Sequence, residues 1–144
     1  MLSVDPGTKA MGWSNWRGDR LESCGVARGK DWITTVLDMP RLKVERLVIE
    51  DQQIYRGSGI DAHALLAVAR VVGGVVLLYG APATLLVRPS IWKGQLPKAV
   101  CHRRTMGKLT EDEQAVLGKT KYSKAIKHNM LDAIGIGLWN LGRR

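Results

Sequence analysis

Five short runs of apolar residues, each bounded by turn residues, predict the strands of a β-sheet. They cover residues 1–5 (MLSVD), 10–16 (AMGWSNW), 20–27 (RLESCGVA), 45–51 (ERLVIED) and 83–89 (ATLLVRP). The first three follow one another through short turns, which favours an antiparallel meander. The run at 45–51 is continuously apolar at its centre, a pattern typical of a strand buried on both faces in the middle of a sheet.

Helical spacing of apolar residues predicts four helices. The expected ranges are 31–39 (DWITTVLDM), 60–79 (IDAHALLAVARVVGGVVLLY), 111–117 (EDEQAVL) and 128–141. Thr110 and Glu113 form a capping box that begins the third of these helices. The apolar helix at 60–79 contains His63, Arg70 and a pair of glycines, so we expect a buried helix rather than a membrane span.

The order of these elements indicates an α/β fold. Three strands, a helix, a buried strand, a long helix, a fifth strand and a terminal helix follow the order of the ribonuclease H-like fold. That fold is a five-stranded mixed sheet flanked by helices. A length of 144 residues with 45% hydrophobic residues suits one domain with a core of its own. We therefore expect a single domain over residues 1–144.

The charge balance points to a polyanionic partner. The chain has 22 Lys and Arg against 13 Asp and Glu, a formal net charge of +9, which favours nucleic acid or an anionic surface. The two cysteines, Cys24 and Cys101, match neither a disulfide framework nor a zinc site. With no secretory signal at the N-terminus, the sequence indicates a cytoplasmic protein with reduced thiols and no membrane association.

Three carboxylates fall at points that this fold brings together. Asp5 ends the first predicted strand, Glu50 ends the fourth, and Asp132 lies on an apolar helix that must pack against the sheet. Neighbouring strand ends lie about 5 Å apart, so these charges repel one another unless cations lie between them. Oxygen ligands of this kind suit Mg²⁺ or Mn²⁺, and a pair of such ions can activate water against a phosphodiester.

Each of these carboxylates also has a simpler explanation. An aspartate before a Pro-Gly turn is often a turn or cap residue, as Asp5 would be. Glu50 could belong to a solvated sheet edge. Asp132 could be a charge favoured by the dipole near the start of a helix. The joint arrangement of the three is what favours a metal site.

The sequence resembles the RuvC-type Holliday-junction resolvases, in particular the short phage-borne versions. The resemblance lies in SVDPGTKAMGWS (3–14), LVIEDQQ (47–53), AHALLAVARVVGGVV (62–76), RPSIWKGQLPK (88–98) and HNMLDAIGIGLW (128–139). It implies that Asp5, Glu50 and Asp132 bind two Mg²⁺ or Mn²⁺ ions per active site, for phosphodiester hydrolysis that leaves 5′-phosphate ends. It also implies a homodimer that acts on branched DNA, in a bacterial cell or a phage-infected host.

One position departs from the family pattern. The last motif of the family carries an acidic residue or a histidine three positions before the final aspartate, and this sequence has Asn129 there, beside His128. Residues 129 and 132 share a helix face, so we expect Asn129 to point toward the metals. An amide oxygen can bind a cation but brings no charge. His128 is then a candidate substitute ligand or base, or else an exposed residue at the start of the helix.

Basic residues concentrate between positions 93 and 127, where nine Lys or Arg accompany three acidic residues. The segment WKGQLPK (92–98) resembles the DNA-contacting segment of the family. The loop QQIYRGSG (52–59) resembles one that inserts near the junction centre in relatives, where Tyr55 would stack on bases and Arg56 would contact phosphate. The expected DNA-binding residues are Tyr55, Arg56, Lys93, Lys98, Arg103, Arg104, Lys108, Lys121 and Lys124.

Three other functions fit parts of this pattern. The motif DPGT (5–8) also resembles the first phosphate loop of actin-like kinases and ATPases, but these need a second such domain, for which 144 residues leave no room. A non-catalytic protein that binds DNA junctions would account for Asn129. A ribonuclease acting on hybrids or on rRNA precursors shares the fold.

Overall fold

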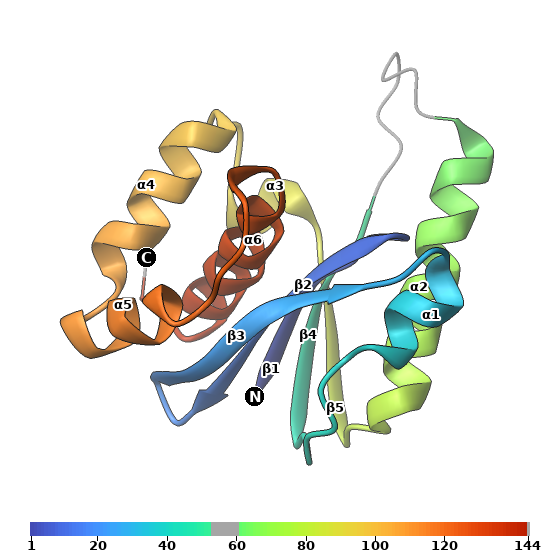
Figure 1. The fold of residues 1–144 in the computed structure, drawn as a ribbon, viewed down its shortest axis with the longest axis horizontal. Coiled ribbons are helices and arrows are strands. Elements are labelled where there is room, and N and C mark those ends of the chain that lie inside the picture. Colours follow the sequence, from blue (N-terminus) through green and yellow to red (C-terminus); the bar gives the residue numbers. More distant parts are fainter. Residues whose placement is uncertain (53–60, 144) are drawn as a thin grey trace.

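A five-stranded mixed sheet lies at the centre of the computed structural model, which describes residues 1–52 and 61–143 (Figure 1). Its strands are β1 (Leu2–Asp5), β2 (Ala10–Arg17), β3 (Arg20–Arg28), β4 (Arg46–Glu50) and β5 (Ala83–Val87). They lie in the order β3-β2-β1-β4-β5; the first three pair antiparallel, and β4 pairs parallel to both β1 and β5. The predicted fold class and meander are confirmed, and the strand predicted at 45–51 is β4, an interior strand buried at four of its five residues.

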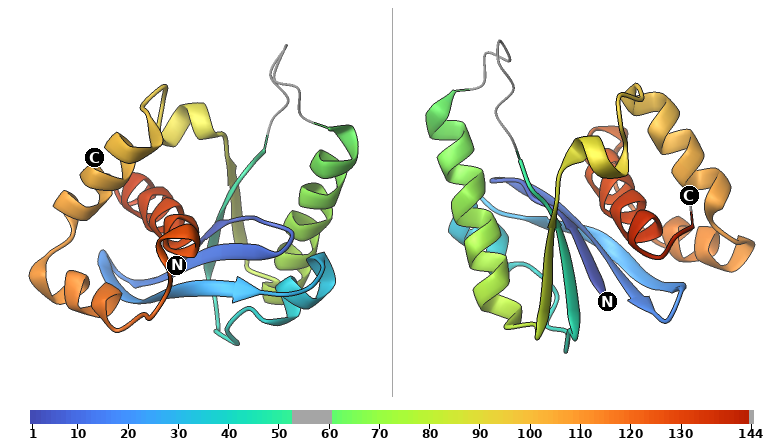
Figure 2. Two further views of the ribbon diagram at one scale, coloured as in Figure 1. Left: turned by 45° about the horizontal axis from the view of Figure 1, so that its top comes forward. Right: turned by 180° about the vertical axis from the view of Figure 1, so that it is seen from behind.

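Helices cover both faces of the sheet (Figure 2). One face carries α1 (Trp32–Leu37) and α2 (Ala62–Tyr79), and the other carries α6 (Lys124–Asn140). Three shorter helices surround α6 on its side of the sheet, namely α3 (Pro89–Trp92), α4 (Lys98–Lys108) and α5 (Glu111–Gly118). The sheet therefore has a separate hydrophobic cluster on each face.

Close packing of α6 on the sheet depends on small residues. A Cβ at Gly12 of β2 would collide with the main-chain carbonyl of Asn129, so only glycine lets the helix approach this strand. The buried Ser14 hydroxyl donates to the carbonyl of Ala133 at 3.1 Å and lies 2.6 Å from the Ser3 hydroxyl. These contacts fix α6 against β1 and β2.

The expectation of a buried helix at 60–79 is wrong. Within α2 only Val71 and Val75 are buried, and Leu77 is 85% exposed. Apart from the exposed His63 and Arg70 the helix is largely apolar, but α1 and the sheet around β1 and β4 cover only one of its sides. Gly74 makes close contact with Val36 of α1, where a Cβ would lie 3.3 Å from its methyl groups. By length and composition alone α2 is also long enough to cross a membrane.

The polar segment 90–123 contains more helix than expected. Beside the predicted α5 it forms α3 and the 11-residue α4. The positions of α4 buried against α6 are Cys101 and Thr105, which give little hydrophobic signal among basic residues. The last helix begins at Lys124 rather than residue 128, and its first turn, KAIK, places Ile126 against the hydrophobic cluster.

A buried carboxylate holds α5 to the rest of this layer. Glu113 is 1% exposed, and both of its oxygens accept hydrogen bonds of 2.7 Å from the Arg143 guanidinium. It also accepts from the main-chain N–H of Leu21 on β3 and of Thr110. Arg143 and these main-chain donors hold the pKa of Glu113 down, from its ordinary 4.5 to about 2. The capping residue expected from the sequence thus also links β3 with the C-terminus.

We predict that Glu113→Gln lowers the free energy of unfolding at pH 7 by about 3 kcal/mol, because it leaves the Arg143 cation without its partner. Since the native pKa of Glu113 is depressed, its stabilisation is complete above pH 4.5 and is lost as the pH falls toward 2. Urea denaturation should therefore show that the free energies of unfolding of the wild type and of Glu113→Gln differ less at pH 3 than at pH 7. The exposed Glu111→Gln is the control; a pH-independent difference would contradict the prediction.

Candidate active site

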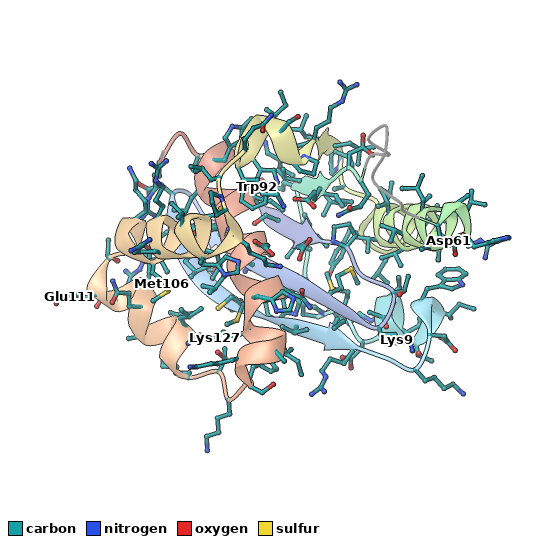
Figure 3. The ribbon with its side chains drawn as sticks, turned by 90° about the horizontal axis from the view of Figure 1, so that it is seen from above. Lys9, Asp61, Trp92, Met106, Glu111 and Lys127 are labelled. Atoms are coloured by element: carbon teal, nitrogen blue, oxygen red, sulfur yellow. The ribbon has the colours of Figure 1, made fainter. Side chains whose placement is uncertain are left out.

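Three carboxylates meet at the edge of the sheet where β1 and β4 end. Asp5 is the last residue of β1 and Glu50 the last of β4, and the parallel register pairs the residues just before them, Val4 and Ile49. Asp132 lies on the face of α6 that packs on the sheet. Glu50 and Asp132 are 3% and 4% exposed. Figure 3 looks down on this edge, with Trp92 of α3 at its border.

Asp5 shows that the three charges influence one another. Burial raises the pKa of Asp5 well above its ordinary value, and the charges of Glu50 and Asp132 raise it further. Lys93 and Lys98 act in the opposite direction. The carboxylates that the sequence places on three distant segments therefore form one electrostatic cluster.

Glu50 is held by side chains from two elements. Its Oε2 accepts from the indole Nε1 of Trp92 at 2.6 Å and lies 3.3 Å from Nζ of Lys93. Gln52 donates to its Oε1 at 2.7 Å. The Lys93 ammonium also lies 4.8 Å from the centroid of the Trp92 ring, a cation–π contact. The short helix α3 and the residue that follows it thus supply a neutral donor and a cation to the carboxylate at the end of β4.

Asp132 is held by two side chains of α4. Nζ of Lys98 lies 3.0 Å from its Oδ2, and Nε2 of His102 lies 2.9 Å from its Oδ1. Lys98 and His102 are four residues apart and so share one face of the helix. Sequence reasoning missed His102, because α4 was not expected. The spacing Lys98–His102 would have placed His102 at the site once that helix was recognised.

Two other predicted site residues lie close by on α6. Asn129 is partly buried one turn before Asp132, with its carbonyl against Gly12. His128 is also partly buried, and burial, followed by the charge of Lys98, lowers its pKa. His128 is therefore near Asp132 and Lys98 rather than on a remote surface, while its part in catalysis stays a prediction.

The predicted DNA-binding residues fall into three groups. Lys93 and Lys98 contact the carboxylates themselves. Tyr55 and Arg56 lie outside the described residues. The others are exposed on α4, in the segment before α6 or at its first residue, on the side of the sheet that carries Asp132: Arg103, Arg104, Lys108, Lys121 and Lys124.

The donor set fits a hard divalent cation. Carboxylate oxygens are the ligands that Mg²⁺ and Mn²⁺ prefer, and the mutual repulsion seen at Asp5 favours a cation among them. Over residues 1–52 and 61–143, no three His, Cys, Asp or Glu side chains converge as tightly as the ligands of a metal ion do. Nitrogen donors of Trp92, Lys93, Lys98 and His102 contact the oxygens instead.

Solved structures with the same fold include three resolvases. Thermus thermophilus RuvC in complex with a Holliday junction substrate superposes with a TM-score of 0.55 at 17% identity, over 96% of this chain and 91% of that one. The chain has the RuvC-like resolvase fold. No protein-family model and no curated protein matches its sequence.

The RuvC-like fold is shared with resolvases from yeast mitochondria and from fowlpox virus. The yeast mitochondrial Holliday junction resolvase gives a TM-score of 0.61 at 14% identity, over 99% of this chain and 77% of that one. The fowlpox virus resolvase, solved with Holliday junction DNA, gives a TM-score of 0.60 at 12% identity, over 98% of this chain and 95% of that one. These likenesses confirm the RuvC-like fold that the sequence motifs implied.

Proposed function

We propose that this chain is a structure-selective endonuclease that cleaves four-way or other branched DNA by metal-dependent phosphodiester hydrolysis. The observation that carries the proposal is the cluster of Asp5, Glu50 and Asp132 directly beside the basic helix α4. The RuvC-like fold supports it, because two of the solved neighbours were captured on Holliday junctions.

In this proposal Asp5, Glu50, Asp132 and the amide oxygen of Asn129 hold the divalent cations, two per site. When bound, the cations neutralise charge on the scissile phosphate and lower the pKa of the attacking water. Lys93 and Lys98 then turn from the carboxylates toward phosphate oxygens, since both side chains are long and partly exposed, at 30% and 56%. The exposed lysine and arginine side chains of α4 bind the neighbouring phosphates of the DNA backbone.

The chain should cleave four-way junctions in Mg²⁺ and bind them more tightly than linear duplex, with affinity that falls steeply as salt rises. We predict that Asp132→Asn slows cleavage at least about 10²-fold, because it removes a charged element of the site. Gel assays with four-way, duplex and hybrid substrates, with and without Mg²⁺, measure both the cleavage rate and the binding affinity. Asp19→Asn, in an exposed turn, is the matched control.

Other outcomes of that experiment would favour the other candidate functions. Selective binding without cleavage in either Mg²⁺ or Mn²⁺ would identify a non-catalytic junction-binding protein, the function that Asn129 favours. Preferred cleavage of the hybrid would identify a ribonuclease. Equal affinity for junction and duplex across a salt series would contradict structural selectivity.

Position 129 allows a sharper test. With Asn129 the site has three anionic ligands, so we predict that Asn129→Asp raises the Mg²⁺-dependent cleavage rate about 10²-fold or more. Junction binding should change little, because it depends on the basic helices. If His128 fills the missing role instead, Asn129→Asp changes little and His128→Ala abolishes cleavage. Cleavage rates over Mg²⁺ and Mn²⁺ titrations distinguish the two hypotheses. If the parent protein is active and neither substitution changes its rate, position 129 lies outside the site.

We further propose that the active form is a homodimer that pairs through α2. Symmetric cleavage of two opposed strands needs two active sites, and a dimer supplies them. Leu66, Gly73 and Leu77 lie on one stripe of α2 together with the exposed Arg70, and the two leucines are 55% and 85% exposed. Large apolar side chains exposed to this degree are typical of a covered surface. Gly73 has no atom near its missing side chain, so a second helix could approach closely there.

We predict that Leu77→Glu converts the dimer to a monomer, because a charge in an apolar interface is costly. Sedimentation velocity at micromolar concentration measures the mass, with and without junction DNA. Ile91→Glu is the control, since Ile91 is 59% exposed on α3, on the other side of the sheet. A monomeric mass for the parent protein, or its co-sedimentation with lipid vesicles, would contradict a dimer through α2.

A further inference from the structure

His102 contacts a candidate metal ligand without belonging to the motifs that identify the site. Its Nε2 lies 2.9 Å from Oδ1 of Asp132, while Lys98 takes Oδ2. A carboxylate oxygen beside a lysine acts as a hydrogen-bond acceptor, so the contact fits the tautomer of His102 that donates from Nε2. Both partners are enclosed: the side chain of His102 is 18% exposed and that of Asp132 is 6% exposed.

The two partners of Asp132 differ in how firmly they can hold it. The Lys98 side chain is 56% exposed and has four rotatable bonds, so it can leave the carboxylate at small cost. The imidazole of His102 has two rotatable bonds and is mostly enclosed between α4 and α6. Of the two contacts, only that of His102 can define one orientation of the carboxylate.

The backbone of α4 is itself fixed on both sides of His102. Cys101 and Thr105 are buried against α6, and the Thr105 hydroxyl lies 3.1 Å from where a Cβ of Gly135 would stand. At the end of the helix, Arg143 donates to the Lys108 carbonyl at 2.7 Å while it pairs with Glu113. The position of His102 is therefore set by packing that does not involve the metal site.

We propose that His102 is a positioning residue, which holds Oδ1 of Asp132 so that Oδ2 would be available to a cation once Lys98 has turned away. The inference rests on the proposed function and deepens it. Hydrogen bonds to ligating carboxylates fix their orientation and strengthen metal binding. His102 acts through Asp132 and does not bind the cation.

Mn²⁺ titration followed by electron paramagnetic resonance tests this role. We expect His102→Ala to weaken Mn²⁺ binding about 10- to 100-fold. His102→Gln should restore most of the affinity, because its terminal amide reaches as far as Nε2, whereas the shorter amide of His102→Asn should not. The exposed His63 on α2 gives the control His63→Ala, with unchanged affinity. Junction binding without metal should stay the same in every variant.

Several results would overturn the inference. If Mn²⁺ affinity is unchanged in folded His102→Ala, or equal in His102→Gln and His102→Asn, the orientation of Asp132 does not depend on His102. The Gln and Asn pair keeps the test decisive where the Ala variant fails to fold. Nitrogen coupling to bound Mn²⁺ that disappears in His102→Gln would make His102 a ligand instead. Wild-type chain that binds no Mn²⁺ overturns the proposed function, and this inference with it.

Discussion

The contact of α6 with the sheet is the constraint on which the rest of the structure depends. Gly12 lets the helix backbone approach β2, and Ser14 bonds to the carbonyl of Ala133, the residue after Asp132. A larger residue at position 12 would push α6 outward and carry Asp132 away from Asp5 and Glu50. Packing and function are therefore joined at one place, because the fit that buries the core of the second layer also brings the third carboxylate to the other two.

The two acidic sites of this half of the molecule have opposite energetics. Glu113 meets a bidentate arginine and two main-chain donors, which lower its pKa to about 2 and stabilise the fold. Asp5 meets burial and two other carboxylates, which raise its pKa and oppose folding in the absence of a cation. The Glu113 site fixes α5 and the C-terminus around α6. This fixed framework offsets the energetic cost of the repulsion among the carboxylates at Asp5.

Sequence reasoning located strands, helices and site residues best where the local apolar pattern agrees with the environment that the fold gives them. Every strand could be read from its apolar residues, and the ends of two such strands located Asp5 and Glu50. The apolar pattern of α6 made Asp132 conspicuous. By contrast α4 is buried through Cys101 and Thr105, too weakly apolar to reveal a helix in a basic segment, so His102 was missed. The exposure of α2 could not be predicted either, because an apolar helix looks the same whether its own chain or a partner covers it.

The hidden helix α4 joins the two halves of the proposed function. One of its faces turns Lys98 and His102 to Asp132, a second packs Cys101 and Thr105 on α6, and its remaining surface exposes Arg103 and Arg104. A phosphate bound by these arginines would act on the same rigid segment that orients the carboxylate. In the proposed function, the segment that binds the DNA backbone and the segment that orients the carboxylate are therefore one rigid helix.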